Sequence, residues 1–451
     1  MQQNYLEGSL WDKILLFALP LAASSFLQQL FNAADSAVVG QFAGNQALAA
    51  VGSVASFINL LINLFVGLSI GANVVIAQYI GEGKRERIHR AVHTSITLSV
   101  SSGILLLILG QLLTNQVLTF MQTPQDTLAL ARIYLRIYFL GMPFMMLYNF
   151  CASILRSIGD TRRPVICLAI AGVVNVCLNL LLVIVFHLDV AGVAIATVTS
   201  NIISSLLMLY LLCHERSAVR VDLSELCIDK DILIYITKIG LPAGLQGMVF
   251  SFSNVIIQTS INSLGSDVMA ASTTSLNFEY FAYFLANSFN QAATTFVGQN
   301  YGAANLKRCR QVTRWCLLLG MTCTGLFTGL LLLCARPLAG IFTGSAIVLS
   351  YAVLRMRYIL SFEIVNEIME VLSGTMRGYG RSFVPALLCI IGVCVFRLIY
   401  VATIFRLHPT FNVLMSVYPC SWILTSAAMI IAYLILCRIL SGSGSLRHSE
   451  R

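Results

Sequence analysis

The stretch VICLAIAGVVNVCLNLLLVIVFH, residues 165–187, decides the fold class of this chain. None of its 23 residues is Asp, Glu, Lys or Arg, and its interior amides are Asn175 and Asn179. A helix of about 20 mostly apolar residues is long enough to span the hydrocarbon core of a bilayer. This stretch therefore predicts a transmembrane helix.

Similar apolar runs recur along the whole chain. Eleven more lie at residues 13–38, 47–78, 92–114, 131–155, 191–213, 232–260, 268–298, 312–334, 350–376, 384–405 and 413–437. Only 10% of the 451 residues are charged and the mean hydropathy is +0.84, whereas soluble domains carry roughly 25% charged residues. The runs do not show the short alternating pattern of barrel strands. We therefore predict an all-α polytopic membrane protein with twelve transmembrane helices.

The basic residues are distributed unevenly between the two sides of these predicted spans. Of 28 Lys and Arg residues, 21 lie near the termini or in and beside the loops after even-numbered spans. Such an excess marks cytoplasmic loops, and it accounts for the net charge of +9 without nucleic acid. The first run is too long for a signal peptide and lacks a cleavage pattern. We expect a multi-pass protein of a bacterial-type inner membrane with both termini cytoplasmic.

The two halves of the sequence resemble each other at a shift of 221 residues. This shift places Leu155–Gly159 on Met376–Gly380, Pro164 on Pro385, and Gln78 on Gln299. Since each half holds an even number of spans, the halves form a parallel repeat with a central cavity between two pseudo-symmetric six-helix lobes. The predicted divisions are lobes at 1–212 and 232–440, a cytoplasmic linker at 213–231 and a cytoplasmic tail at 441–451.

Four oxygen-bearing side chains fall at one depth of the first lobe. Asp35 lies toward the outer end of its span, Asn175 and Asn179 share a helix face four residues apart, and Thr197 lies in the outer half of the next span. Intramembrane ionisable groups are functional candidates by default. The four side chains are candidates for a small cation site holding Na⁺ or H⁺, although interhelical hydrogen bonds would also explain the amides and Thr197.

The second lobe has more acidic residues within its spans. Glu279 lies deep in the eighth span beside Tyr280, and Glu363, Glu367 and Glu370 share one face of the tenth span at i, i+4 and i+7. Such a face must meet water, a cavity or a partner. Arg397 is expected to neutralise Glu363 or Glu279. The remaining acids and the neighbouring aromatic rings suit an organic cation.

These motifs, in this order and twice over, are similar to those of the multidrug and toxic compound extrusion (MATE) transporters. The similarity extends over most of the chain and rests on residues 19–20, 35–52, 78–81, 155–164, 192–197 and 297–302. It implies export of amphipathic, often cationic, compounds by alternating access, driven by Na⁺ or H⁺. It also implies that the protein is not an enzyme and has no cofactor.

The resemblance also assigns site residues. It matches Asp35, Asn175 and Thr197 to the family's cation site, and it adds Tyr134, with Tyr138 as the alternative. Where the family often has Asp, this chain has Asn179, so the site has lost one negative charge. The family often has a coupling acid in the seventh span, where the nearest polar candidate here is Asn254.

We therefore expect a monomeric antiporter for a small organic cation. The alternative is a lipid-linked saccharide flippase of the same two-lobe fold, whose cavity would need several basic residues to handle pyrophosphate. Arg397 is the main candidate for such a residue within the spans. A channel would need filter-like rings, and an enzyme would need a nucleophile and base pair, which His187 at the end of a span does not supply.

Overall fold

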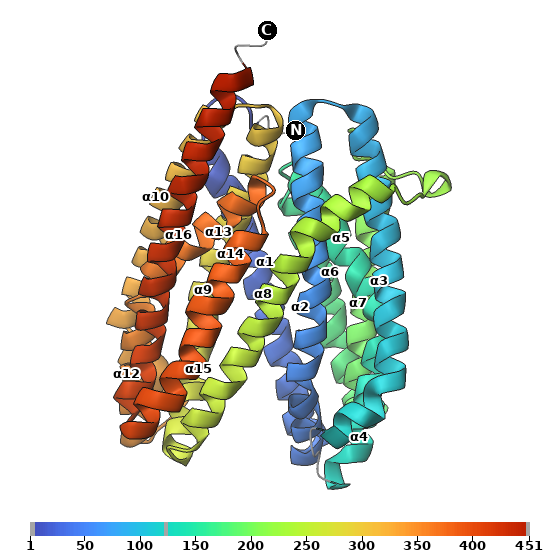
Figure 1. The fold of residues 1–451 in the computed structure, drawn as a ribbon. Helices are drawn as coiled ribbons and strands as arrows, with labels where there is room; N and C mark the ends of the chain where they lie inside the picture. The colour runs from blue at the N-terminus through green and yellow to red at the C-terminus, as the bar shows by residue number, and fades with distance from the viewer. Residues whose placement is uncertain (1–4, 121–124, 448–451) are drawn as a thin grey trace. The chain divides into compact units, whose positions relative to one another are not determined.

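The computed structural model describes residues 5–120 and 125–447. Across these two segments the chain is helical and contains no β-strand, so the predicted all-α class is confirmed. The helices of the first half are α1 (Trp11–Val38), α2 (Asn45–Glu82), α3 (Arg85–Phe120), α4 (Gln125–Leu140), α5 (Met142–Ser157), α6 (Arg162–Leu180) and α7 (Asp189–Cys213) (Figure 1).

The helices of the second half follow a linker that contains one short 3₁₀ turn, Leu223–Glu225. They are α8 (Lys230–Asn262), α9 (Ser266–Gly302), α10 (Leu306–Leu333), α11 (Ala335–Gly340), α12 (Ala346–Leu360), α13 (Glu363–Gly378), α14 (Phe383–Cys389), α15 (Phe396–Tyr400) and α16 (Phe411–Arg447). π-Helical turns extend α1 over Val39–Ala43 and α6 over Leu181–Val185, and two more flank α15.

Every predicted span corresponds to a helix, but two of the spans are broken. The run at 131–155 is divided into α4 and α5, which meet at Gly141 with a bend of 46°. Pro143 at the start of α5 explains this break, because proline has no N–H to continue the preceding helix. The run at 350–376 is divided into α12 and α13 at Ser361 and Phe362.

Nine of the described helices are long and apolar enough to cross a membrane, or ten when α4 and α5 count as one span. The two other predicted spans are α9 and the α12–α13 pair. α9 buries many polar side chains, Glu279 and Asn290 among them, and α12 and α13 are each too short alone. The polarity of α9 and the short length of α12 and α13 thus explain why the count falls below twelve.

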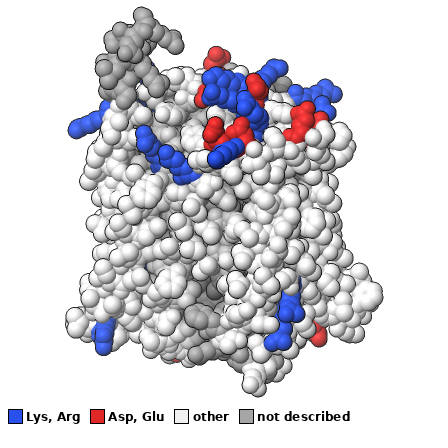
Figure 2. All heavy atoms as spheres, turned by 45° about the vertical axis from the view of Figure 1, so that its right-hand side comes forward, with Lys and Arg blue, Asp and Glu red and all other residues white. Residues whose placement is uncertain are grey.

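The outer faces of the helices are apolar. On α10, Leu326, Leu330 and Leu333 are 72%, 59% and 85% exposed and follow each other at helical spacing. In Figure 2 the Lys, Arg, Asp and Glu side chains gather towards the helix ends, and uncharged residues form the middle of the visible face. An exposed leucine stripe between charged ends is the surface that a lipid bilayer solvates.

Contacts divide the chain into two compact units. The first consists mainly of Leu19–Met248, and the second of Glu7–Ala18, Val249–Tyr301 and the chain from Asn305 onwards. The first unit therefore includes the N-terminal part of α8, and the second includes the first turns of α1. The predicted lobe limits at residues 212 and 232 stay a prediction.

The linker after α7 is paired with the starts of α3 and α6 at one end of the first unit. Arg163 pairs with Glu215 at 2.5 Å, and Arg90 pairs with Asp229 at 3.4 Å. The charge pattern assigns these segments to a single side of the membrane. That this side is cytoplasmic stays a prediction.

Glycines allow α2 and α8 to touch backbone to backbone within the first unit. A Cβ atom on Gly67 would lie 2.3 Å from the Gly244 nitrogen, and one on Gly71 would lie 2.3 Å from the Ile236 carbonyl oxygen. Gly240 and Gly244 provide the matching small surface on α8. Small residues four apart on both helices are typical of close helix packing in membranes.

Candidate functional site

The four candidate side chains of the first lobe lie together in the structure. Asp35 of α1 accepts a hydrogen bond from the Asn179 amide of α6, and that same amide nitrogen lies 3.2 Å from the Asn175 oxygen. Asn175 and Asn179 are buried at 4% and 0% exposure. Asn179 thus links the carboxylate of one helix to the amide of its own helix one turn earlier.

Thr197 and two tyrosines complete this group. The Thr197 hydroxyl of α7 lies 3.5 Å from Asp35 Oδ2 and donates to the Val193 carbonyl at 2.9 Å. Tyr134 of α4 is buried and lies against Tyr138, with ring centroids 5.7 Å apart. Both phenols interact electrostatically with Asp35. We call Asp35, Asn175, Asn179 and Thr197 the Asp35 cluster.

A glycine brings α1 and α6 close enough for this contact. A Cβ atom on Gly172 would lie 1.8 Å from the Phe31 ring, so the ring of α1 occupies the space that a side chain on α6 would fill. Asp35 and Asn179 follow these residues by one and two helical turns. The π-helical turns Val39–Ala43 and Leu181–Val185 come directly after them, and such turns occur frequently at functional sites.

The Asp35 cluster offers oxygen atoms and one negative charge. Asn179 Oδ1 is buried and has no hydrogen-bond partner among the described residues. No Lys, Arg or His in the described part of the chain forms an ion pair with Asp35. Oxygen ligands around a single carboxylate suit a small hard cation, and a proton on Asp35 would neutralise the same charge.

The acids of the tenth predicted span are all buried in the second unit, and each one meets a different partner. Glu363 accepts from Asn366 of its own helix at 2.8 Å, Glu367 accepts from Thr324 of α10 at 2.9 Å, and Glu370 accepts from Asn290 of α9. The face predicted to meet water or a partner therefore packs on polar groups of α9 and α10. Glu367 Oε1 is buried without a hydrogen bond in the described chain.

Arg397 forms no direct ion pair with either of its two predicted partners, Glu363 and Glu279, among the described residues. Glu279 is paired with Arg355 of α12, whose Nε and Nη2 donate to the two carboxylate oxygens at 2.7 and 2.9 Å. Arg397 instead donates from Nε to Ser421 at 3.1 Å, and its guanidinium lies over the Tyr418 ring at 4.4 Å. It forms no ion pair with an acid among the described residues. Arg355, 1% exposed, is thus a second arginine deep in this unit that sequence reasoning missed.

Two other predicted residues lie apart from these buried acids. Tyr280 is 45% exposed and stacks on Phe284, with ring centroids 6.1 Å apart. Asn254 is exposed and makes no hydrogen bond within the described segments. Neither side chain contacts Glu363, Glu367 or Glu370 through a hydrogen bond, and their roles stay predictions.

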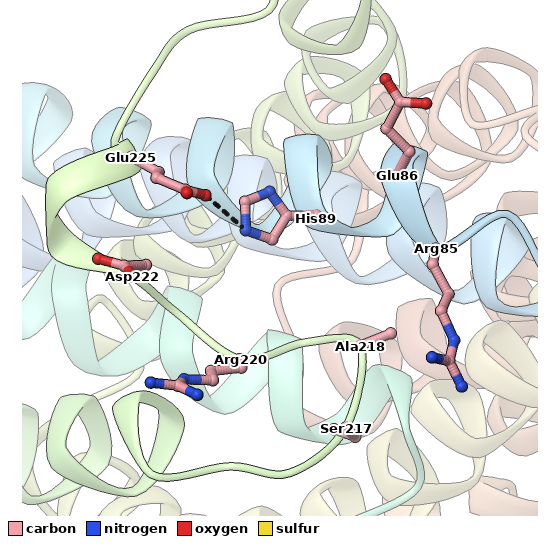
Figure 3. Close-up of a pocket in the computed structure, with 8 residues that line it drawn as sticks. All are labelled: Arg85, Glu86, His89, Ser217, Ala218, Arg220, Asp222 and Glu225. Atoms are coloured by element: carbon pink, nitrogen blue, oxygen red, sulfur yellow. Dashed lines mark ion pairs between the residues drawn. The ribbon is translucent and has the colours of Figure 1, made fainter.

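A separate polar pocket lies where the linker folds over the start of α3. It has a volume of about 460 Å³ and is lined by Arg85, Glu86, His89, Ser217, Ala218, Arg220, Asp222 and Glu225 (Figure 3). His89 Nε2 lies 3.1 Å from a Glu225 oxygen. Asp222 carries hydrogen bonds from the Ser224 hydroxyl and backbone N–H, which lower the pKa of its carboxyl.

His93, one turn after His89, brings a third potential metal ligand within 4.8 Å of this pair. Both of its ring nitrogens already bind backbone. Nε2 lies 3.0 Å from the backbone nitrogen and 3.1 Å from the carbonyl oxygen of Asp222, and Nδ1 lies 2.7 Å from the His89 carbonyl oxygen. His93 therefore fastens the linker to α3, and two ligands remain for a metal.

Comparison with known families agrees with the twofold repeat. The MatE family model matches residues 20–181 and again residues 242–403. The chain belongs to the MatE family. The two matches begin 222 residues apart, close to the shift found in the sequence. Membership of the MatE family confirms the predicted resemblance.

Relatives of this MatE protein cover most of its length. It is 28% identical over 398 residues to the probable multidrug resistance protein YoeA of Bacillus subtilis, covering 87% of this chain and 86% of the relative. It is 26% identical to the probable multidrug resistance protein NorM of Thermotoga maritima, over 86% and 84% of the two chains.

Solved structures share the fold of this MatE chain. An outward-facing multidrug resistance MATE transporter of the MOP superfamily aligns with a TM-score of 0.90 at 21% identity, covering 97% of this chain and 98% of that one. A MOP superfamily transporter from Pyrococcus furiosus, described as having a binding pocket of reverse polarity, aligns with a TM-score of 0.90 at 22% identity over the same shares. At these identities the likeness concerns the fold.

Proposed function

We propose that this protein is a secondary antiporter that exports amphipathic organic cations in exchange for Na⁺ or H⁺. The observation that carries the proposal is the contact between Asp35 and Asn179. It holds the one acidic side chain of the Asp35 cluster in contact with two further helices of an apolar bundle. The relatives named above as multidrug resistance proteins support export as the direction of transport.

The Asn179 amide gives this cluster two arrangements. In the first, its nitrogen donates to Asp35 while its oxygen is buried and unpartnered. A cation at Asp35 would repel that N–H group and attract the oxygen, so the amide turns over. A proton on Asp35 has the same effect, because the new O–H group needs an acceptor. Binding of a cation at Asp35 thus changes the hydrogen bonds between α1 and α6.

The driving force for this exchange depends on the charge of the exported molecule. One charge that moves through 100 mV releases about 2.3 kcal/mol, which corresponds to roughly a 40-fold concentration ratio. When the exported molecule carries one positive charge, the electrical terms of a one-for-one exchange cancel. The concentration gradient of the coupling ion then drives export.

The charge balance of the second unit favours a cationic substrate. Its buried interior holds four carboxylates, Glu279, Glu363, Glu367 and Glu370, against three guanidinium groups, Arg355, Arg377 and Arg397. One of these arginines is already neutralised by Glu279. An interior with excess acid suits a cation better than the pyrophosphate of a lipid-linked saccharide.

We assign both termini to the cytoplasm on the distribution of basic residues.

The test is efflux of a cationic dye from proteoliposomes under Na⁺ and H⁺ gradients imposed one at a time. We expect one gradient to drive efflux and Asp35→Asn to abolish the driven component. The matched control is Asp189→Asn, since Asp189 is exposed and its φ of 46° suits Asn as well as Asp. Full ion-driven efflux by Asp35→Asn would disprove the role of Asp35.

A further inference from the structure

Three buried side chains of the second unit hold N–H groups that no acceptor meets. Arg355 Nη1, Arg397 Nη1 and Nη2, and Trp422 Nε1 are all buried without a hydrogen-bond partner in the described residues. The three side chains are 1%, 1% and 5% exposed. Buried donors are almost always paired in folded proteins, and guanidinium donors most of all. Four such groups on three neighbouring side chains call for an explanation.

All four groups belong to side chains that surround one ring. The guanidinium carbons of Arg397 and Arg355 lie 4.4 and 5.7 Å from the centre of the Tyr418 ring, and the Trp422 ring meets it edge-on at 5.9 Å. Arg355 comes from α12, Arg397 from α15, and both aromatic residues from α16 (Figure 1). We call these four residues the Tyr418 cluster.

The Tyr418 cluster has one positive charge that no carboxylate neutralises by direct contact. The charge of Arg355 is balanced by Glu279, which accepts two of its hydrogen bonds. Arg397 meets the Ser421 hydroxyl, the Tyr418 ring and the face of Phe250 at 5.8 Å. Glu363 of α13 accepts from Asn366 and interacts with Arg397 electrostatically, but the two form no ion pair within 4.0 Å. A guanidinium keeps its proton at any physiological pH.

We propose that the Tyr418 cluster binds a monovalent anion, either a halide or a carboxylate. One net positive charge matches one negative charge, and the unpaired N–H groups supply the donors that such an anion accepts. A phosphate dianion would exceed the available charge. The proposal rests on the second unit alone and is independent of the Asp35 cluster.

Trp422 makes the binding measurable. The chain has three tryptophans, and the other two, Trp11 and Trp315, are 51% and 38% exposed. With both of these replaced by Phe, fluorescence of the full-length protein in detergent reports on Trp422. Iodide is then titrated against sulfate, a dianion whose charge exceeds that of the cluster, at constant ionic strength. We expect quenching that saturates at millimolar iodide, whereas collisional quenching by unbound iodide rises without saturation.

Two substitutions locate the site. Arg397→Gln should weaken the saturable iodide binding at least tenfold, and Arg357→Gln, an exposed arginine of α12, should leave it unchanged. An unchanged Trp422 emission maximum shows that Arg397→Gln still folds. If that variant does not fold, the titration of the protein with Arg397 intact decides alone. Quenching that never saturates, or that saturates equally with Arg397→Gln, overturns the proposal.

Competition identifies the class of anion. Displacement of iodide by chloride and not by acetate would support a halide site, and displacement by acetate at equal or lower concentration would support a carboxylate site. The Asp35→Asn variant should bind iodide unchanged, because the measurement involves no gradient and no transport. Iodide binding at the Tyr418 cluster can therefore be observed even if Asp35 has no role in transport. Likewise, a failure to bind iodide would not affect the transport proposal.

Discussion

Arg355 and Glu279 are joined by two parallel hydrogen bonds, 2.7 and 2.9 Å long, between buried side chains of α12 and α9. Removing one member of a buried ion pair leaves the other charge uncompensated, which typically costs about 3–5 kcal/mol. We predict that Glu279→Gln lowers the free energy of unfolding by this amount, measured by thermal unfolding in detergent. The double variant Glu279→Leu with Arg355→Met should lose less free energy of unfolding than either of its single variants. A loss in the double variant equal to the sum of the two single losses would contradict the pairing.

Glu367, in contrast to Glu279, is a buried acid of the same unit that forms no ion pair among the described residues. One of its oxygens accepts from Thr324, while the other is buried without a partner and occupies the space that a Cβ on Gly320 would fill, at 2.2 Å. Since Gln keeps the shape and removes a charge that burial penalises, Glu367→Gln should unfold at the same or a higher temperature. Gly320→Ala should unfold at a lower temperature. If Glu367→Gln lowered the unfolding temperature as much as Glu279→Gln does, this account would be refuted.

Asn179→Asp should strengthen cation binding at the Asp35 cluster. A second carboxylate in hydrogen-bond contact with Asp35 cannot stay charged without a proton or a metal cation. We expect the concentration of coupling ion that gives half-maximal efflux to fall about tenfold, on an electrostatic gain of ~1.4 kcal/mol. Asn115→Asp adds the same charge at an exposed position of another helix, α3, and is the control. An equal effect from both variants would point to general attraction of cations.

The contact between α2 and α8 predicts a sharp difference between neighbouring glycines. A Cβ on Gly244 would lie 2.2 Å from the Leu64 carbonyl oxygen, whereas one on Gly247 would make ordinary contact with Asn63 at 3.4 Å. We predict that Gly244→Ala lowers the unfolding temperature, because it pushes the two backbones apart. Gly247→Ala should be neutral or slightly stabilising, since Ala favours the helix. Similar unfolding temperatures for both variants would count against the close packing.

We predict that the local stability of the linker around Asp222 decreases as the pH falls. Hydrogen bonds from Ser224 lower the pKa of the Asp222 carboxyl in the folded state. They therefore contribute stability above the ordinary pKa of aspartate, and that stability is lost as the pH falls through the lowered value. Hydrogen exchange at the Ser224 amide, corrected for its intrinsic rate, should rise relative to other linker amides as the pH falls. In Asp222→Asn, which cannot titrate, this rise should be absent.

Much of the fold follows from the sequence because membrane helices have simple requirements. Apolar length alone located all twelve helical segments, and the repeated residues at 155–159 and 376–380 indicated the duplication that the MatE matches confirm. The break at Gly141 had a signal in Pro143, which the prediction of one continuous span overlooked. The break between α12 and α13 has no proline, and its position depends on tertiary packing.

The side-chain partners were less predictable. The rise per residue predicts that Asp35, Asn175, Asn179 and Thr197 lie at one depth, and in the structure these side chains lie in hydrogen-bond contact. Arg355 was overlooked because an arginine near a span end normally reaches the interface, and only its contact with Glu279 explains its burial. The link from His93 to Asp222 joins residues far apart in the sequence through backbone atoms, which no residue pattern reveals.

The division of the two units across α1 and α8 affects how the protein is made. The first unit extends to Met248, although its last helix before the linker ends at Cys213. At roughly 5–20 residues per second of synthesis, the ribosome needs some seconds more to supply the missing piece of α8. A nascent chain that stops at the linker therefore exposes Gly67 and Gly71 without their partner surface. We expect such a chain to be degraded by membrane quality control. When the halves on either side of the linker are expressed separately, we expect the first half to fold stably only if the second half is present.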